Sequence, residues 1–96
     1  MRFEWDEAKN RHNLAKHRIS FETATLVFDD SHALSFQDLI VNGEERWQTF
    51  GMIGGLIVMV AHTFWEEDGE EVIRLISARK ATSGERRIYE AHKKSY

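Results

Sequence analysis

The chain has 96 residues, a formal net charge of −3 and no cysteine. A chain of this length forms one domain around one core, and the lack of cysteine excludes a disulfide framework and a thiolate site, as expected in a reducing cytoplasm. The charged N-terminus MRFEWDEAKN is unlike a signal peptide, and the longest apolar run, residues 56–61, is too short to cross a bilayer. We therefore expect a single cytoplasmic domain over residues 1–96.

The charges are unevenly distributed along the chain. Residues 1–18 carry a net charge of +2, residues 19–78 a net charge of −9, and residues 79–96 a net charge of +4. Two basic ends can attract phosphate groups although the whole chain is acidic. The alternative interpretation, which stays open, is that these charges only solvate the surface.

Two short helices are predicted before the strands. Asp6 is a suitable N-cap for a helix that continues to about His17. The thin apolar stripe of this helix comprises Trp5, Ala8, His12 and Ala15. Ser20 is the expected N-cap of the second helix, which ends in a turn at residues 29–31. Its buried stripe comprises Phe21, Ala24, Val27 and Phe28.

Four strands follow, separated by turn signals. Asn42-Gly43 is the strongest hairpin signal in the chain, and Gly54-Gly55 is a second tight turn. An acidic loop, residues 66–71, precedes the last strand. The predicted strands cover residues 33–39, 45–52, 56–65 and 72–79. We expect them to pair as an antiparallel meander.

A final helix is predicted after the last strand. Thr82 and Glu85 have the T-x-x-E spacing of a capping box, which marks a helix start. The element order is therefore ααββββα. It predicts an α+β fold with two N-terminal helices, a four-stranded antiparallel sheet and a C-terminal helix.

Arg79 and Lys80 stand where the last predicted strand ends and the last helix approaches. A helix N-terminus presents free backbone N–H groups, and Arg offers a planar fork of donors that suits phosphate oxygens. These two residues are therefore candidates for binding phosphate. The alternative is an exposed strand end or a salt bridge to the acidic middle of the chain.

Further polar residues lie on the predicted strands and the last helix. Arg74 and Arg46 each either pair with a carboxylate such as Glu45 or line a cleft, because a buried Arg is rarely left unpaired. His62 could be a general acid or base, since imidazole titrates near neutral pH, or it could be structural. Tyr89 either packs in the core or stacks on a base.

No metal or cofactor site is predicted. His12 and His17 are five residues apart, which misses the i, i+4 spacing of a helical metal pair. The chain also lacks G-x-x-x-x-G-K-[ST], G-x-G-x-x-G and G-x-S-x-G. P-loop nucleotide hydrolysis, dinucleotide binding and α/β-hydrolase chemistry are therefore unsupported.

Several stretches together resemble the BrnT family of bacterial toxins. They cover nearly the whole chain in order and at matching spacing, and the stretch that begins at Arg74 is the most specific. They are Phe3-Glu4-Trp5-Asp6, Lys9-Asn10, Asn13-Leu14, Lys16-His17, Ile19-Ser20-Phe21-Glu22, Val27-Phe28-Asp29-Asp30, Gly43-Glu44-Glu45-Arg46, Arg74-Leu75-Ile76-Ser77-Ala78-Arg79-Lys80-Ala81-Thr82, Glu85-Arg86-Arg87 and Tyr89-Glu90.

The resemblance implies a RelE-like toxin of a type II toxin–antitoxin system, with two N-terminal helices, a small antiparallel sheet and a C-terminal helix. It implies a metal-independent endoribonuclease that arrests growth by cleaving RNA and needs no cofactor. It also implies a BrnA-type antitoxin with a ribbon-helix-helix part, which typically forms a two-plus-two complex with the toxin and binds promoter DNA.

In the implied reaction the ribose 2′-OH attacks the adjacent phosphate. A base takes its proton, an acid protonates the leaving 5′-oxygen, and cations hold the phosphate. We assign the phosphate to Arg79 and Lys80 with support from Arg46 and Arg74, the proton transfers to His62 and Glu45, and RNA contacts to Arg86, Arg87 and Tyr89.

Two features depart from this expectation. Ser83-Gly84 stands where the family pattern is often basic, and the acidic loop at residues 66–71 would repel RNA if it lay near the cleft. The competing hypotheses are an inactivated toxin, a non-catalytic module whose basic ends bind nucleic acid or an acidic partner, and an adaptor held by its partner. Arginines that converge on one concave face would favour the enzyme, and scattered, paired arginines would favour the module.

Overall fold

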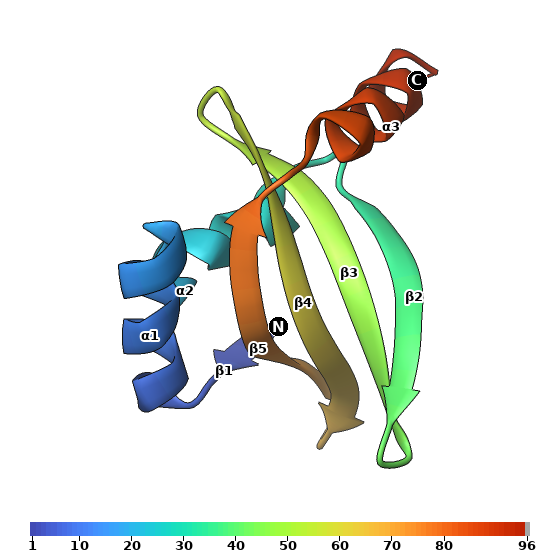
Figure 1. Cartoon of the computed structure of the whole chain (residues 1–96). Helices are drawn as coiled ribbons and strands as arrows, with labels where there is room; N and C mark the ends of the chain where they lie inside the picture. Colours follow the sequence, from blue (N-terminus) through green and yellow to red (C-terminus); the bar gives the residue numbers. More distant parts are fainter. Residues whose placement is uncertain (96) are drawn as a thin grey trace.

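A five-stranded sheet forms the centre of the molecule, and helices pack on both of its faces (Figure 1). The computed structural model describes residues 1–95. Its elements are β1 (Arg2–Glu4), α1 (Glu7–His17), α2 (Phe21–Ala24), the 3-10 helix η1 (Thr25–Asp29), β2 (Leu34–Val41), β3 (Glu44–Ile53), β4 (Leu56–Glu67), β5 (Glu70–Lys80) and α3 (Ser83–Lys94).

The sheet is mixed, in the order β1-β5-β4-β3-β2. Strand β1 pairs parallel to β5, with Phe3 opposite Ile73, and the other neighbours are antiparallel. The predicted four-stranded antiparallel meander is therefore wrong. No strand is predicted over residues 2–4, because three residues are too few to show a strand period. They form a strand because the edge of β5 offers them backbone partners.

Two-residue turns connect the antiparallel strands. Asn42 and Gly43 both have positive φ, at 52° and 77°, so the predicted hairpin turn is confirmed. Asp68 and Gly69 repeat it, with φ of 52° and 76°. The predicted acidic loop at residues 66–71 is therefore wrong, since most of these residues extend β4 and β5 around an Asp-Gly turn.

One face of the sheet is covered by α2 and η1. Phe21 and Val27 are fully buried there, as predicted, and they pack against β4 and β5. Gly51 of β3 lies so close to η1 that an added Cβ would stand 2.7 Å from the backbone oxygen of Val27. The absence of a side chain at Gly51 therefore lets η1 approach the sheet.

Helix α1 docks through amide groups rather than through an apolar stripe. Asn10 and Asn13 are its buried residues, whereas Ala8, His12 and Ala15 of the predicted stripe are exposed. The Asn13 amide donates to the carbonyls of Ile19 and Ala78, both at 2.9 Å, and accepts from the Ala78 N–H at 3.0 Å. The apolar pattern failed here because hydrogen bonds hold the helix against the sheet edge.

Helix α3 packs on the other face, at one end of the sheet (Figure 1). The capping box of Thr82 and Glu85 is confirmed. Tyr89 is buried among Phe50, Ile57 and Met59, and its hydroxyl donates to the Asp30 carboxylate. The same carboxylate accepts the Met52 N–H at 2.8 Å and the His32 N–H at 2.9 Å. Asp30 thus ties α3 to the segment that enters β2.

Substitution of Gly51 by Ala should destabilise the protein by roughly 1–3 kcal/mol, because the new methyl group would overlap the Val27 backbone. Urea unfolding would measure the loss. Gly55→Ala is the matched control, since an added Cβ at Gly55 meets nothing within 4 Å and its φ is not positive. Equal stability of the two variants would contradict the close approach of η1.

Candidate functional site

Three arginines lie on the sheet face that carries α3, which we call the α3 face. Thr63 stands opposite Arg74, and Met59 stands opposite Arg79. His62 packs against Phe28 of η1, so it lies on the opposite face, and its β3 partner Trp47 lies there too. Side chains alternate along a strand, so Arg46, the residue before Trp47, lies on the α3 face. The structure thus brings Arg46, Arg74 and Arg79 to one face.

A β-bulge in β5 produces this arrangement. The register of β4 and β5 shifts between Ala61 and His62, so that Ser77 and Leu75 face consecutive β4 residues and Ile76 is the extra residue. Without the bulge, Arg74 and Arg79 would point to opposite faces, because they are five residues apart and strand side chains alternate.

Arg79 forms a two-pronged ion pair with Glu85 of α3. Its Nη1 donates to Oε1 at 2.8 Å and its Nη2 to Oε2 at 3.1 Å. The bonds from Arg79 lower the pKa of Glu85 to about 2, and the same bonds raise the pKa of Arg79. The salt bridge foreseen as an alternative for Arg79 therefore exists, but its partner is the capping residue of α3.

Arg74 and Arg46 differ in their partners. Arg74 donates to Glu4 of β1 at 3.0 Å, not to Glu45. The Nε of Arg46 and the Oγ1 of Thr63 are buried without a hydrogen-bond partner, and no other buried side-chain nitrogen or oxygen of residues 1–95 is in that state. Buried polar atoms are nearly always paired, so these two atoms are exceptions, and both belong to the α3 face.

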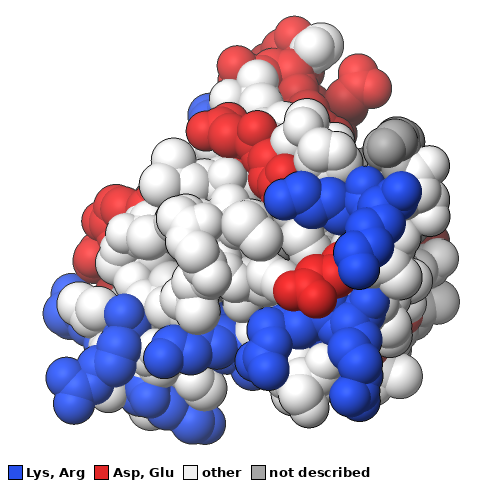
Figure 2. All heavy atoms as spheres, turned by 90° about the horizontal axis from the view of Figure 1, so that it is seen from above, with Lys and Arg blue, Asp and Glu red and all other residues white. Residues whose placement is uncertain are grey.

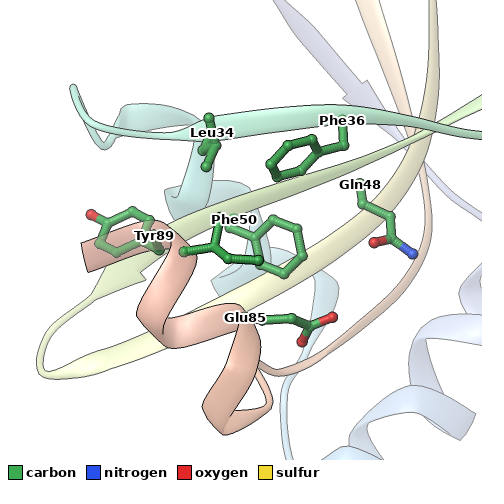
Figure 3. Close-up of a pocket in the computed structure, with 7 residues that line it drawn as sticks. Leu34, Phe36, Gln48, Phe50, Glu85 and Tyr89 are labelled. Atoms are coloured by element: carbon green, nitrogen blue, oxygen red, sulfur yellow. The ribbon is translucent and has the colours of Figure 1, made fainter. Parts of the chain in front are cut away.

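A cleft of about 270 Å³ lies between α3 and the two strands β2 and β3 (Figure 3). In its wall the Phe36 and Phe50 rings pack edge to face, with their centroids 6.1 Å apart. The side-chain amide of Gln48 donates to the Asp38 carboxylate at 3.0 Å. Its lining residues are Leu34, Phe36, Gln48, Phe50, Glu85, Ile88 and Tyr89. Since Glu85 lines the cleft and is paired with Arg79, this aromatic cleft is next to Arg79.

The remaining predicted site residues lie elsewhere. His62 is buried on the opposite face, where its Nε2 is 2.7 Å from the Thr49 hydroxyl and burial lowers its pKa. Glu45 and Lys80 are exposed on that opposite face, by strand alternation. Tyr89 is buried, and burial with the Asp30 bond raises its pKa to about 12.

Arg86 and Arg87 are exposed on α3. In the view of Figure 2, Lys and Arg side chains gather along the lower edge of the molecule. Of the 13 Lys and Arg residues, 11 belong to residues 1–18 and 79–96, so the two basic ends of the chain supply most of the positive charge. Within residues 1–95, no group of His, Asp or Glu side chains is placed to hold a metal, and no helix is long and apolar enough to span a membrane.

Sequence reasoning missed Gln48, Thr63 and Phe36. Gln48 could have been found from Arg46, because residues two apart on a strand share a face. No comparable signal exists for Thr63 and Phe36, because they belong to other strands and reach this face only through the register of strand pairing.

Comparison with known proteins identifies one family. The family model described as the ribonuclease toxin BrnT of type II toxin–antitoxin systems matches residues 5–85. No curated protein matches the chain. The match extends from the residue that precedes the α1 cap to the capping residue Glu85, and so includes all three arginines of the α3 face.

The Arg79–Glu85 pair should make stability depend on pH in the acid range. Folding lowers the pKa of Glu85 from 4.5 to about 2, so the folded state binds protons less tightly. The stabilisation is complete above about pH 4.5 and is lost as the pH falls towards 2. The pair is partly exposed, so its contribution should be about 1 kcal/mol.

Urea unfolding of the protein and of Glu85→Gln at several pH values would measure this contribution. The difference in unfolding free energy between them should shrink as the pH falls. Glu90→Gln, at an exposed position of the same helix, is the control and should show no such trend. A difference that is constant with pH would contradict the ion pair.

Proposed function

This chain belongs to the BrnT family of ribonuclease toxins of type II toxin–antitoxin systems, and on that premise we propose that it is a metal-independent endoribonuclease whose active site is the α3 face. As a type II toxin it has an antitoxin partner. We propose a BrnA-type antitoxin with a ribbon-helix-helix part, a two-plus-two complex that contacts promoter DNA through the antitoxin, and action on RNA in the cytoplasm.

One observation carries the proposal: three arginines share a sheet face beside an aromatic cleft. Arg46 offers a buried, unpaired donor, and Arg79 presents a fork of donors beside Glu85. The Glu85 carboxylate occupies the Arg79 fork much as two phosphate oxygens would, since the fork fits carboxylate and phosphate alike. A phosphate that displaced Glu85 would be held by charge-assisted bonds.

The aromatic cleft supports a nucleic-acid substrate. Unpaired RNA bases bind to proteins by stacking on aromatic rings and by hydrogen bonds to their edges. Phe36 is partly exposed in the cleft wall, and the Gln48 amide stands beside it. We propose that a base next to the scissile phosphate enters this cleft.

The reaction follows from placing the phosphate at Arg79. The 2′-oxygen forms a bond to phosphorus while the bond from phosphorus to the 5′-oxygen breaks. The products are a 2′,3′-cyclic phosphate and a 5′-hydroxyl, whose proton is supplied by water. Arg79 stabilises the negative charge that develops on the phosphate oxygens. Arg46 lies level with Thr63, four residues along β4 from Met59, which stands opposite Arg79, so we propose that it adds to the positive potential of the face. Arg74 is bound to Glu4 and supports the positive potential of the face.

We assign the proton of the attacking 2′-OH to Glu85. Among the described residues that line the cleft, Glu85 alone carries a carboxylate. Its pKa of about 2 makes it a weak base while it is bound to Arg79. When the phosphate takes the Arg79 donors, Glu85 loses the interaction that lowers its pKa and becomes a stronger base. His62 and Glu45 are left out because they lie on the opposite face.

A second function, non-catalytic binding of nucleic acid, is favoured by a specific observation. Two of the three arginines are already paired with carboxylates, as expected for a structural role. RNA cleavage distinguishes the two functions, because an enzyme cleaves the RNA that it binds and a binding module leaves it intact.

Cleavage of a labelled single-stranded RNA in EDTA tests the enzyme. We expect products with 2′,3′-cyclic phosphate ends, and a loss of rate of roughly 10²–10³-fold in Arg79→Ala, since it removes a donor to the developing charge. Arg46→Ala should cause a smaller loss, because it lowers the positive potential of the face. Lys94→Ala, at an exposed position in the last turn of α3, should cleave normally.

Binding of RNA without cleavage, with free RNA and again with ribosomes, would favour the binding module. Cleavage that survives both arginine substitutions would contradict the placement of the active site on the α3 face. Thermal melting of each variant separates a loss of chemistry from a loss of fold.

Glu85→Gln tests the assigned base. The amide cannot take a proton, so cleavage should fall by roughly 10²–10⁴-fold, and the acid limb of the rate profile against pH should disappear. An unchanged acid limb would assign the proton transfer to another group.

A further inference from the structure

A second cleft, of about 310 Å³, lies between α1 and β5. Six residues of α1 line it on one side, and they follow the three- and four-residue spacing that places residues on one helix face. Four of them, Lys9, His12, Lys16 and His17, carry amino or imidazole groups, and the other two are Ala8 and Asn13. On the other side lie Ile76 and Ser77 of β5. The predicted apolar position His12 is therefore part of a basic cleft.

The cleft is positive and its lysines are unpaired. Its lining contains no carboxylate among the described residues. Lys9 and Lys16 form no ion pair within residues 1–95, in contrast to Arg2, Arg74 and Arg79. Two ammonium groups without counter-charges in a chain of net charge −3 are suited to an anionic ligand.

The cleft is continuous with the α3 face. Ser77 lines the cleft and lies two residues before Arg79, on the same side of β5. Two residues of a strand span about 7 Å. Ile76, the extra residue of the β-bulge, also lines the cleft. The bulge that brings Arg74 and Arg79 to one face therefore also borders the basic cleft. A chain bound at Arg79 therefore needs only a short extension to reach α1.

We propose that this cleft binds the backbone phosphates of single-stranded RNA next to the phosphate held at Arg79. The inference rests on the proposed function, which places the scissile phosphate at Arg79, and extends the RNA-binding surface to α1. The lysines bind the phosphates as compact charges, and the imidazole rings of His12 and His17 offer faces for unpaired bases. The continuity with Arg79 favours RNA over an acidic protein segment.

The test is binding of a single-stranded RNA whose 2′-hydroxyls are methylated, so that the attacking group is absent and binding is measured without cleavage. The variant Lys9→Ala/Lys16→Ala should bind at least about tenfold more weakly at low salt. Because each phosphate contact contributes about 0.7 to the salt slope for single strands, losing two contacts should reduce the slope by about 1.4.

Lys93→Ala/Lys94→Ala is the matched control, because it removes the same charge from exposed positions in the last turn of α3. It should change the affinity by less than about twofold. Equal weakening by the two variants would overturn the proposal, since the effect would then come from net charge alone. Thermal melting verifies that both variants fold.

An acidic peptide separates the two kinds of partner. The proposal is overturned in favour of a protein segment by two results together. A short poly-glutamate peptide would compete with RNA for the wild type, and Lys9→Ala/Lys16→Ala would bind RNA normally but would not bind the peptide. A cleavable dinucleotide, whose single phosphate is the scissile one, has no neighbouring phosphate for the cleft and should be cut equally by the wild type and by Lys9→Ala/Lys16→Ala. If the dinucleotide and longer RNA are never cut but binding of the methylated RNA still depends on the two lysines, the proposed catalysis fails and the cleft stands.

Discussion

The side-chain amide of Asn13 takes the place of a neighbouring strand at the edge of β5. Strand β1 pairs with β5 only as far as Glu4 opposite Arg74, and beyond that point the edge has no strand partner. The Asn13 amide both donates to and accepts from the backbone of Ala78, and it also donates to Ile19. Each of these buried backbone groups would cost about 1–3 kcal/mol if left unpaired.

Both proposed binding surfaces depend on this contact. Ala78 directly precedes Arg79, so Asn13 fixes the backbone from which the central arginine projects. The same contact holds α1 against β5, which creates the basic cleft. A single amide therefore positions the phosphate site and the surface along which the rest of the RNA is proposed to lie.

Arg79 is paired so that an anionic ligand at its donors has to exchange with Glu85. Glu85 completes the capping box of α3 with Thr82 and also neutralises Arg79. Arg74 is paired with Glu4 as well, so two of the three arginines already have a carboxylate partner, which limits the cost of holding three arginines on one face. In the proposed reaction a phosphate at Arg79 releases the Glu85 carboxylate to act as the base, so the pair that stabilises the protein would also contribute to catalysis.

The sequence determined the features that depend on neighbouring residues. The caps at Asp6, Ser20 and Thr82, the Asn42-Gly43 turn and the basic ends could all be predicted, because helix starts, tight turns and local charge depend on a few adjacent residues. The family, too, follows from short stretches at fixed spacing, and the family match over residues 5–85 confirms it.

Only the tertiary structure decided which residues meet. The parallel strand β1 exists because β5 offers it an edge, and α1 docks by amides that no hydrophobic pattern reveals. A bulge at Ile76 places Arg74 and Arg79 on one face, whereas His62 and Glu45 fall on the other. One inserted residue reverses the direction of every side chain beyond it, and a bulge is set by packing between strands, so the membership of the site could not be predicted from the sequence.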